Sequence, residues 1–378
     1  MRRDTGPVHT WLLALVLVVL LPWQPQAAAP LPRITLRQRQ GEHRVFVDPD
    51  GRERIFHGSS AVVKGPPWVP DRDTFSSDIS MAREDFVWMQ SLGLNVLRLG
   101  VFWAGLEPTR GHYNETYLDQ LERIVDLAGA HGVYVFLDMH QDGLSELFCG
   151  EGFPPWAIRR QHNAAMRFPA PFSPAFNDSQ MYNEPVGSLG RIPRDSACGE
   201  SHGPDYGQWT RETAGAYQAI YSNWDGLGDA FAAAWAKVAA RFAHRPEILG
   251  LELINEPFAG DFYTDTINET NWMNSTLMIP WPNPDNADAK NLQPLFDRVN
   301  AAVRMFDDEV LLFFAGIIWD NYGAGFTAPP GGWDYANRSV LTYHYYNPPQ
   351  TTVQLQFDSF NKSARRLQVS SRLSNNII

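Results

Sequence analysis

The chain has 378 residues, a formal net charge of −11 and two cysteines. This length can bury a large core and fits one barrel-sized domain. The acidic balance, without any basic stripe, argues against a nucleic-acid partner, and the 13 Trp, 13 Tyr and 22 Phe favour an aromatic binding groove.

Residues 1–29 predict a secretory signal peptide. Arg2 and Arg3 precede an apolar run from Trp11 to Leu21, and alanines at 27–29 offer a cleavage site. A signal anchor is the alternative, but no stop-transfer pattern follows the run. We therefore expect a secreted protein, located outside the cell or in the endolysosomal lumen. Six glycosylation sequons agree with export: Asn114, Asn177, Asn268, Asn274, Asn337 and Asn361.

Strands and helices alternate along the rest of the chain. Residues 33–57 alternate apolar and polar side chains and predict a hairpin that caps one end of the fold. Six strands are then expected at 55–63, 94–101, 133–137, 248–257, 310–318 and 340–346, with helices at 80–92, 116–131, 229–243 and 289–306. This alternation predicts a parallel sheet, and the length of a single domain predicts a (β/α)8 TIM barrel.

A long segment at residues 143–222 interrupts this alternation. It is rich in Pro, Phe and Trp, lacks clear periodicity and contains both cysteines. Such long insertions are usually functional or disordered. The two cysteines and the aromatic residues favour an ordered wall or lid over the site. In an oxidising compartment Cys149 and Cys198 are expected to form a disulfide, with two separate buried thiols as the alternative. Two cysteines without nearby His support form no metal cluster, so neither a metal nor a cofactor is predicted.

Residues 248–257 read I-L-G-L-E-L-I-N-E-P, a buried strand that ends in polar residues. The adjacent Asn255 and Glu256 suit sugar chemistry, since a carboxylic acid can protonate a leaving oxygen and an amide can bind a sugar hydroxyl. When this motif is taken alone, a solvated turn is the better explanation. Other polar side chains also follow predicted strands, and together they point to one catalytic face: Lys64, Arg98, His140, Asp142, His344 and Tyr346.

With these residues in place, the chain resembles glycoside hydrolase family 5. Asp138–Asp142 (D-M-H-Q-D) and Phe148–Trp156 (F-C-G-E-G-F-P-P-W) resemble the endoglycoceramidases and related glycosylceramidases of that family. The resemblance runs from about Phe56 to about Leu367. It implies a retaining barrel enzyme with two catalytic glutamates, which cleaves the bond between a glycan and ceramide. A glycosphingolipid or other β-glycoside would be the substrate, reached through transient contact with a membrane surface or micelle.

The resemblance also implies a role for individual residues. Glu256 would be the general acid/base, protonated near the working pH, and Asn255 would bind the 2-hydroxyl of the sugar. Tyr346 would hold the nucleophilic carboxylate in place. The remaining substrate-binding residues would be Lys64, Arg98, His140, Asp142 and His344.

One feature of the family pattern is missing from this sequence. The second glutamate of the family ends strand seven, in a motif of the Thr-Glu-Phe-Gly kind. No Glu follows Glu309, and the only later acids are Asp320, Asp334 and Asp358. We therefore expect residues 30–367 to form an incomplete barrel of about six strands and 368–378 to be a divergent tail. Because retention needs two carboxyl groups, we expect this chain to be inactive.

Two other functions remain open. One is an endo-β-glucanase, whose cleft would carry more Asp, Asn and Gln around its Trp residues than a ceramide site would. The other is a secreted glycolipid-binding pseudoenzyme that keeps the sugar pocket without hydrolysis, and the missing nucleophile favours it.

Overall fold

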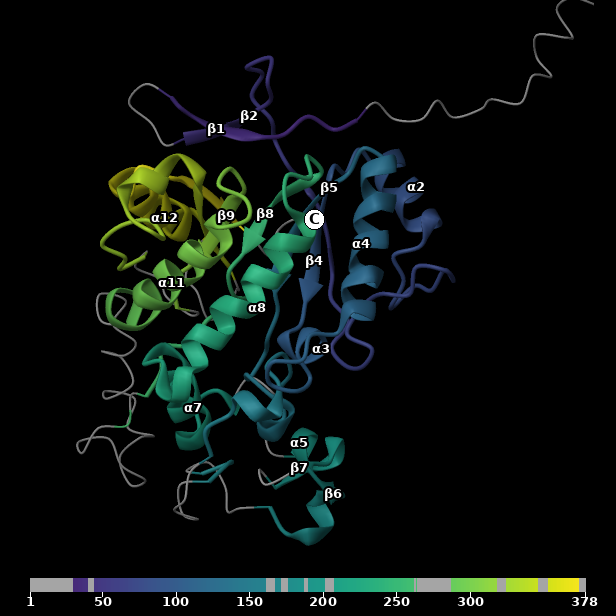
Figure 1. The fold of residues 1–378 in the computed structure, drawn as a ribbon, viewed down its shortest axis with the longest axis vertical. Coiled ribbons are helices and arrows are strands. Elements are labelled where there is room, and N and C mark those ends of the chain that lie inside the picture. The colour runs from purple at the N-terminus through teal and green to yellow at the C-terminus, as the bar shows by residue number, and fades with distance from the viewer. Residues whose placement is uncertain are drawn as a thin grey trace, which may run out of the picture.

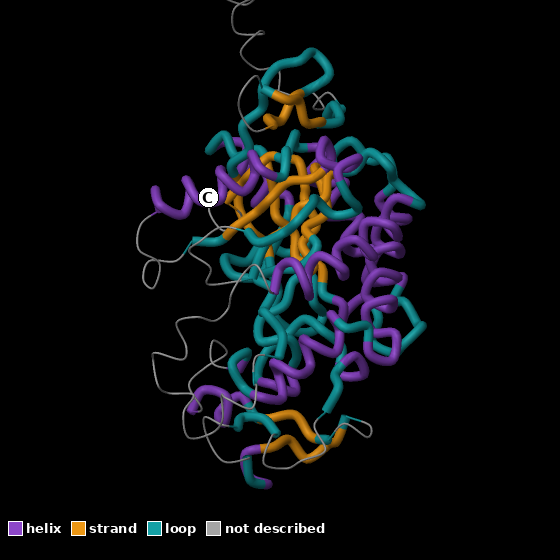
Figure 2. The backbone as a smooth tube through the Cα atoms, turned by 90° about the vertical axis from the view of Figure 1, so that its left-hand side faces the viewer, coloured by secondary structure: helices purple, strands orange, loops and turns teal. Residues whose placement is uncertain are grey.

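The computed structural model describes residues 30–39, 44–160, 167–170, 176–186, 190–200, 207–261, 263, 287–317, 324–345 and 353–373. These residues form a parallel sheet flanked by helices, with a small hairpin at each end of the molecule (Figures 1 and 2). The expected signal peptide at 1–29 and the expected site residue Tyr346 lie outside the described residues.

Seven parallel strands form the main sheet. They are β3 (Gly58–Ala61), β4 (Val96–Val101), β5 (Tyr134–Met139), β8 (Ile248–Glu252), β9 (Leu311–Ala315), β10 (Ser339–Tyr343) and β11 (Ser370–Leu373). Each strand pairs with the strand of this sheet that follows it in the sequence, which is the order of a (β/α)8 barrel. Strands β3 and β11 form the two edges. Every residue from β4 to β10 in this sheet is buried, as parallel strands covered on both faces require.

The strand at Ser370–Leu373 corrects the sequence analysis. It pairs with β10 in parallel register, with Ser370 opposite Val340, so a seventh strand is present where about six were expected. The segment S-S-R-L has no apolar run, and therefore its periodicity gave no sign of a strand. This segment is a strand because its backbone pairs with that of β10. Within the described ranges, no eighth strand joins β11 to β3.

The four predicted helices are all present. They correspond to α2 (Arg83–Ser91), α4 (Glu115–Ala130), α8 (Leu227–Phe242) and α11 (Gln293–Arg304), the last preceded by a π-helical turn at Asp288–Leu292. Further helices are α3 (Trp103–Leu106), α5 (Asp195–Glu200), α7 (Arg211–Tyr221) and α12 (Val353–Arg366). Short 3-10 turns lie at Glu146–Phe148, Pro155–Ala157, Asp178–Gln180, Trp224–Gly226 and Trp333–Arg338.

The predicted N-terminal hairpin is confirmed. Strands β1 (Thr35–Gln38) and β2 (Arg44–Val47) pair in antiparallel register. Their apolar side chains pack against the residues that begin the barrel strands, and so they close the amino-terminal end of the barrel. The contact involves Ile34, Leu36, Phe46 and Phe56 on one side and Val96, Tyr134, Leu249, Leu311 and Val340 on the other.

The long insertion lies at the opposite end of the molecule (Figure 1). It contains a second hairpin, β6 (Met181–Pro185) and β7 (Arg191–Pro193), and the predicted disulfide is confirmed, with Cα atoms of Cys149 and Cys198 5.5 Å apart. Helix α7 was not predicted, although Ala214, Tyr217 and Tyr221 lie at helical spacing along it. The disulfide indicates an oxidising compartment. No helix among the described residues is long and apolar enough to span a bilayer.

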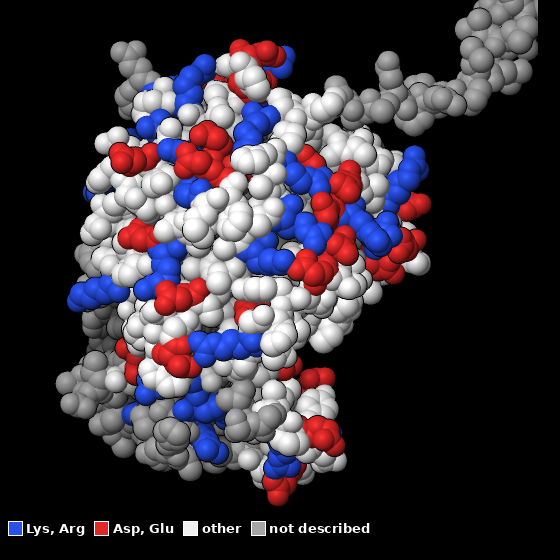
Figure 3. Space-filling view, viewed as in Figure 1, with Lys and Arg blue, Asp and Glu red and all other residues white. Residues whose placement is uncertain are grey.

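Ion pairs join α4 and α8 on the outer surface. Arg241 contacts Glu115, Asp119 and Glu122, and Arg245 also reaches Glu122 at 3.3 Å. Figure 3 shows positive and negative side chains intermingled over this face of the molecule. The charges here are paired across two helices and form no patch of one sign.

Candidate active site

The guanidinium of Arg98, on β4, holds together the base of the site. This side chain is 4% exposed and donates from Nε to Glu252 at 2.6 Å. Its Nη2 donates to Asn255 Oδ1 at 2.8 Å and lies 2.9 Å from Asp138 Oδ2. Burial opposes the charge, but the carboxylates of Asp138 and Glu252 outweigh it and raise the pKa of Arg98. Arg98 is therefore a buried cation whose partners are all protein groups.

His140 follows β5 and lies between two carboxylates. Its Nδ1 is 2.6 Å from Asp138 Oδ2, and its Nε2 is 3.3 Å from Asp142 Oδ2. Burial disfavours the imidazolium, yet Asp138 and Asp142 together raise the pKa of His140 to about 9. At neutral pH both ring nitrogens therefore carry protons, and the ring donates to both carboxylates.

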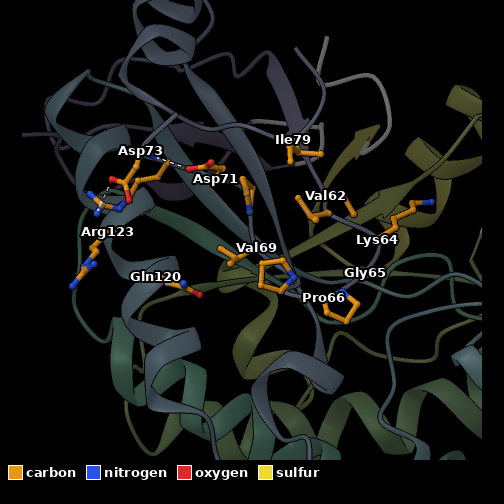
Figure 4. A pocket seen from close by; sticks show the side chains of 14 residues that line it. Val62, Lys64, Gly65, Pro66, Val69, Asp71, Asp73, Ile79, Gln120 and Arg123 are labelled. Carbon is orange, nitrogen blue, oxygen red and sulfur yellow. Dashed lines mark hydrogen bonds and ion pairs between the residues drawn. The ribbon is translucent and has the colours of Figure 1, made fainter. Parts of the chain in front are cut away.

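The Asp142 carboxylate also meets Lys64, which follows β3. Burial favours the neutral acid, but His140 and Lys64 lower the pKa of Asp142. The Lys64 ammonium contacts Asp142 and lies 3.5 Å from Glu151 Oε1. Lys64 also borders a cavity of about 650 Å3 formed by the loop after β3, and its side chain points away from Asp71 and Asp73 (Figure 4). The ammonium is therefore directed toward the carboxylates that follow β5.

Glu256 is held in an uncommon backbone conformation. Its φ is +41°, a region that non-glycine residues adopt only where the surroundings enforce it. Gln141 supplies this support, because its Nε2 donates to the carbonyls of Asn255 at 2.7 Å and Glu256 at 3.1 Å. Tyr217 in turn donates to Gln141 Oε1 at 2.6 Å. The Glu256 side chain lies 2.5 Å from His344 Nδ1, after β10.

The structure brings the predicted residues together at the carboxyl ends of the strands. Contacts link Lys64, Asp142, His140 and Asn255 into one set, and Asn255 is followed directly by Glu256. His344 joins through its contact with Glu256, so the described candidate residues lie close together, and their part in catalysis or binding stays a prediction. The remaining candidate, Tyr346, is not described.

Five further residues of the site were missed: Asp138, Gln141, Glu151, Tyr217 and Glu252. The sequence did carry a signal for Glu252. It is the one charge in its apolar strand, just as Arg98 is in β4, and two lone charges on buried strands imply a pair. The polar contacts of Gln141 and Tyr217 depend on how the chain folds, and no local pattern predicts them.

These groups define a class of protein. A carboxyl group beside an imidazole, an immobilised amide and a cluster of charged donors and acceptors at the carboxyl ends of barrel strands are what acid-catalysed cleavage of glycosides uses. Among the described residues, the one cluster with metal-ligand spacing is His140, Asp142 and Glu151. The arrangement resembles the sites of barrel enzymes that act on carbohydrates.

Comparison with known proteins gives the family. Residues 48–377 match the model of Cellulase (glycosyl hydrolase family 5), and the chain belongs to this family. It is 41% identical to the endoglycoceramidase of Cyanea nozakii and 39% identical to that of Hydra vulgaris, each over 88% of this chain. The chain spans 61% and 60% of those relatives, respectively.

A solved structure confirms the fold. Endo-glycoceramidase II from Rhodococcus sp., in complex with ganglioside GM3, matches with a TM-score of 0.59 and 21% identity. The match covers 86% of this chain and 67% of that chain. At this level of identity the likeness supports the barrel architecture and does not by itself assign a substrate.

Proposed function

We propose that the protein is an endoglycoceramidase-type hydrolase, which cleaves the bond between the glycan and the ceramide of a glycosphingolipid. The observation that carries this proposal is the placement of Asn255 and Glu256 beside His344 at the carboxyl ends of the strands. About 40% identity to two endoglycoceramidases supports the choice of substrate.

Each group has a defined task in this proposal. Glu256 protonates the ceramide oxygen as the bond breaks, and the Asn255 amide binds the 2-hydroxyl of the sugar. Arg98 acts through Asn255, because its own hydrogen bonds are taken up by protein groups. His140, Asp142 and Lys64 bind the hydroxyls of the sugar at the cleavage point, and Tyr346 positions the nucleophile.

An apolar cavity favours a lipid over a soluble polysaccharide. A cavity of about 600 Å3 lies between the loops that follow β3, β4 and β5, and its walls are mainly prolines and tryptophans. The polar side chains that line it are Glu146 and Thr109. The remaining walls are Pro66, Trp68, Ala104, Pro108, Pro154, Pro155, Trp156 and Val186. A glucanase cleft would need more amides and carboxylates around its aromatic rings.

The test of this function is the release of intact glycan from ganglioside GM3 in detergent micelles, followed by mass spectrometry. A protein that carries this sequence together with a second barrel glutamate should release it. The variant Glu256→Gln should lose about 10²–10⁴-fold in rate, because the ceramide alkoxide then leaves without a proton. Glu309→Gln, at the amino-terminal end of β9, is the matched control and should keep full activity. Activity on cellulose with none on GM3 would move the assignment to the glucanase.

For the 378-residue polypeptide itself we propose binding of glycolipid without hydrolysis. Its sequence has no glutamate after Glu309 to attack the anomeric carbon, and a retaining mechanism needs a second carboxyl group about 5 Å from the first. We also propose that the protein is exported, as its disulfide and its sequons favour. Secreted material should then begin near Pro30 when its amino terminus is sequenced.

A further inference from the structure

Glu151 lies on a segment packed directly against the strand-end residues of the site. Its backbone nitrogen donates to Asp142 O at 2.7 Å, and Asp142 N donates to Glu151 O at 3.0 Å. The flanking residues must be glycine for this approach: a Cβ on Gly150 would lie 2.1 Å from Asp142 O, and one on Gly152 would lie 2.4 Å from Gln141 Cβ. The position of Glu151 relative to Asp142 is therefore fixed by the backbone.

The side chain of Glu151 faces the sugar-binding cations of the proposed site. It is 14% exposed, and its Oε1 lies 3.5 Å from Lys64 Nζ. Lys64 comes from the loop after β3, whereas His140 and Asp142 follow β5, and these three groups surround the carboxyl. Burial raises the pKa of Glu151 to about 7, and the Asp142 carboxylate adds to this while Lys64 opposes it.

A metal ion is the first ligand to consider for such a cluster. His140, Asp142 and Glu151 have ligand atoms within 4.8 Å of one another. However, the Lys64 ammonium already forms an ion pair with each of the two carboxylates. The Lys64 ammonium therefore supplies the positive charge of this cluster, and Glu151 is one of the two carboxylates beside it.

We propose that Glu151 is a positioning residue for glycan recognition: it holds the Lys64 ammonium against Asp142, so that both present fixed hydrogen-bonding groups to the sugar. This inference rests on the proposed function. A lysine that is half exposed, as Lys64 is, would otherwise move among many rotamers, and ordering it costs side-chain entropy. Two carboxylates on a fixed backbone supply that order before the ligand binds.

The test is the dissociation constant of the 378-residue polypeptide for GM3 in detergent micelles, measured by calorimetry at pH 8. Glu151→Gln should weaken binding about three- to tenfold, the range expected for coupled neighbours. Glu309→Gln is the control, because it removes an exposed carboxyl at the amino-terminal end of β9, away from Lys64, and it should stay within about twofold of wild type. In a Lys64→Met background, Glu151→Gln should cause no further loss.

A second readout separates positioning from general structural damage. Glu151 loses its charge as the pH falls through about 7, so the difference between wild type and Glu151→Gln should shrink from pH 8 to pH 5.5. Equal affinity of the two proteins at pH 8 would overturn the inference, as would a loss that persists in the Lys64→Met background or at pH 5.5. Absence of GM3 binding by wild type would instead overturn the proposed function, and the inference with it.

Discussion

Replacing Arg98 by Met removes the cation that three buried groups share. Its guanidinium lies 2.6 Å from Glu252, 2.9 Å from Asp138 and 2.8 Å from Asn255, and both carboxylates are 1% exposed or less. The variant takes away the guanidinium that Glu252 and Asp138 share, while His140 stays beside Asp138. Breaking a buried ion pair by removing one partner costs about 3–5 kcal/mol, and we expect Arg98→Met to lower the free energy of unfolding by this amount.

Urea-induced unfolding at pH 7, followed by tryptophan fluorescence, measures this loss. Arg98→Lys should lose less, because an ammonium can meet one carboxylate but cannot reproduce the planar fork of hydrogen bonds. Arg123→Met, at an exposed position on α4, is the control and should change the free energy by no more than about 0.5 kcal/mol. A loss below about 1 kcal/mol would refute the reasoning.

Three further results are expected. Cys198→Ser should reduce stability by up to about 4 kcal/mol, the chain-entropy value for a loop of this size, and free thiols in the unreduced wild type would contradict the bond. His140 has a pKa of about 9, above its ordinary 6.5, so its stabilisation should be complete below pH 6.5 and be lost as the pH rises through 9. In melting curves, His140→Asn should not show this loss of stability as the pH rises through 9. Arg241→Ala should cost about 1 kcal/mol in low salt and less in 1 M salt, and an equal cost in both would rule out the ion pairs as the cause.

The order of the barrel could be predicted from the sequence because its central strands are apolar runs. Strands β4, β5, β8, β9 and β10 are each buried along their whole length, and buried runs alternating with amphipathic helices are visible without a structure. Strand β11 was missed for the opposite reason. Its four residues include two serines and an arginine, and only the edge of β10 gives them a partner.

The site was predictable where function places polar residues after strands. Asn255, Glu256, His140 and His344 each follow an apolar run, and the sequence shows that directly. The supporting contacts were not predictable, because they join residues far apart in the chain. Tyr217 reaches Gln141 across 76 positions, and only the packed fold sets that distance.

The most direct test of the account is a search for intact GM3 glycan after incubation of the purified, monomeric 378-residue polypeptide with GM3 micelles. We expect the polypeptide to bind the micelles through the site at Glu256 and to release no glycan, because its sequence supplies the proton donor without the second glutamate. Turnover that disappears in Glu256→Gln would contradict it, and would mean that another carboxyl group acts as the nucleophile.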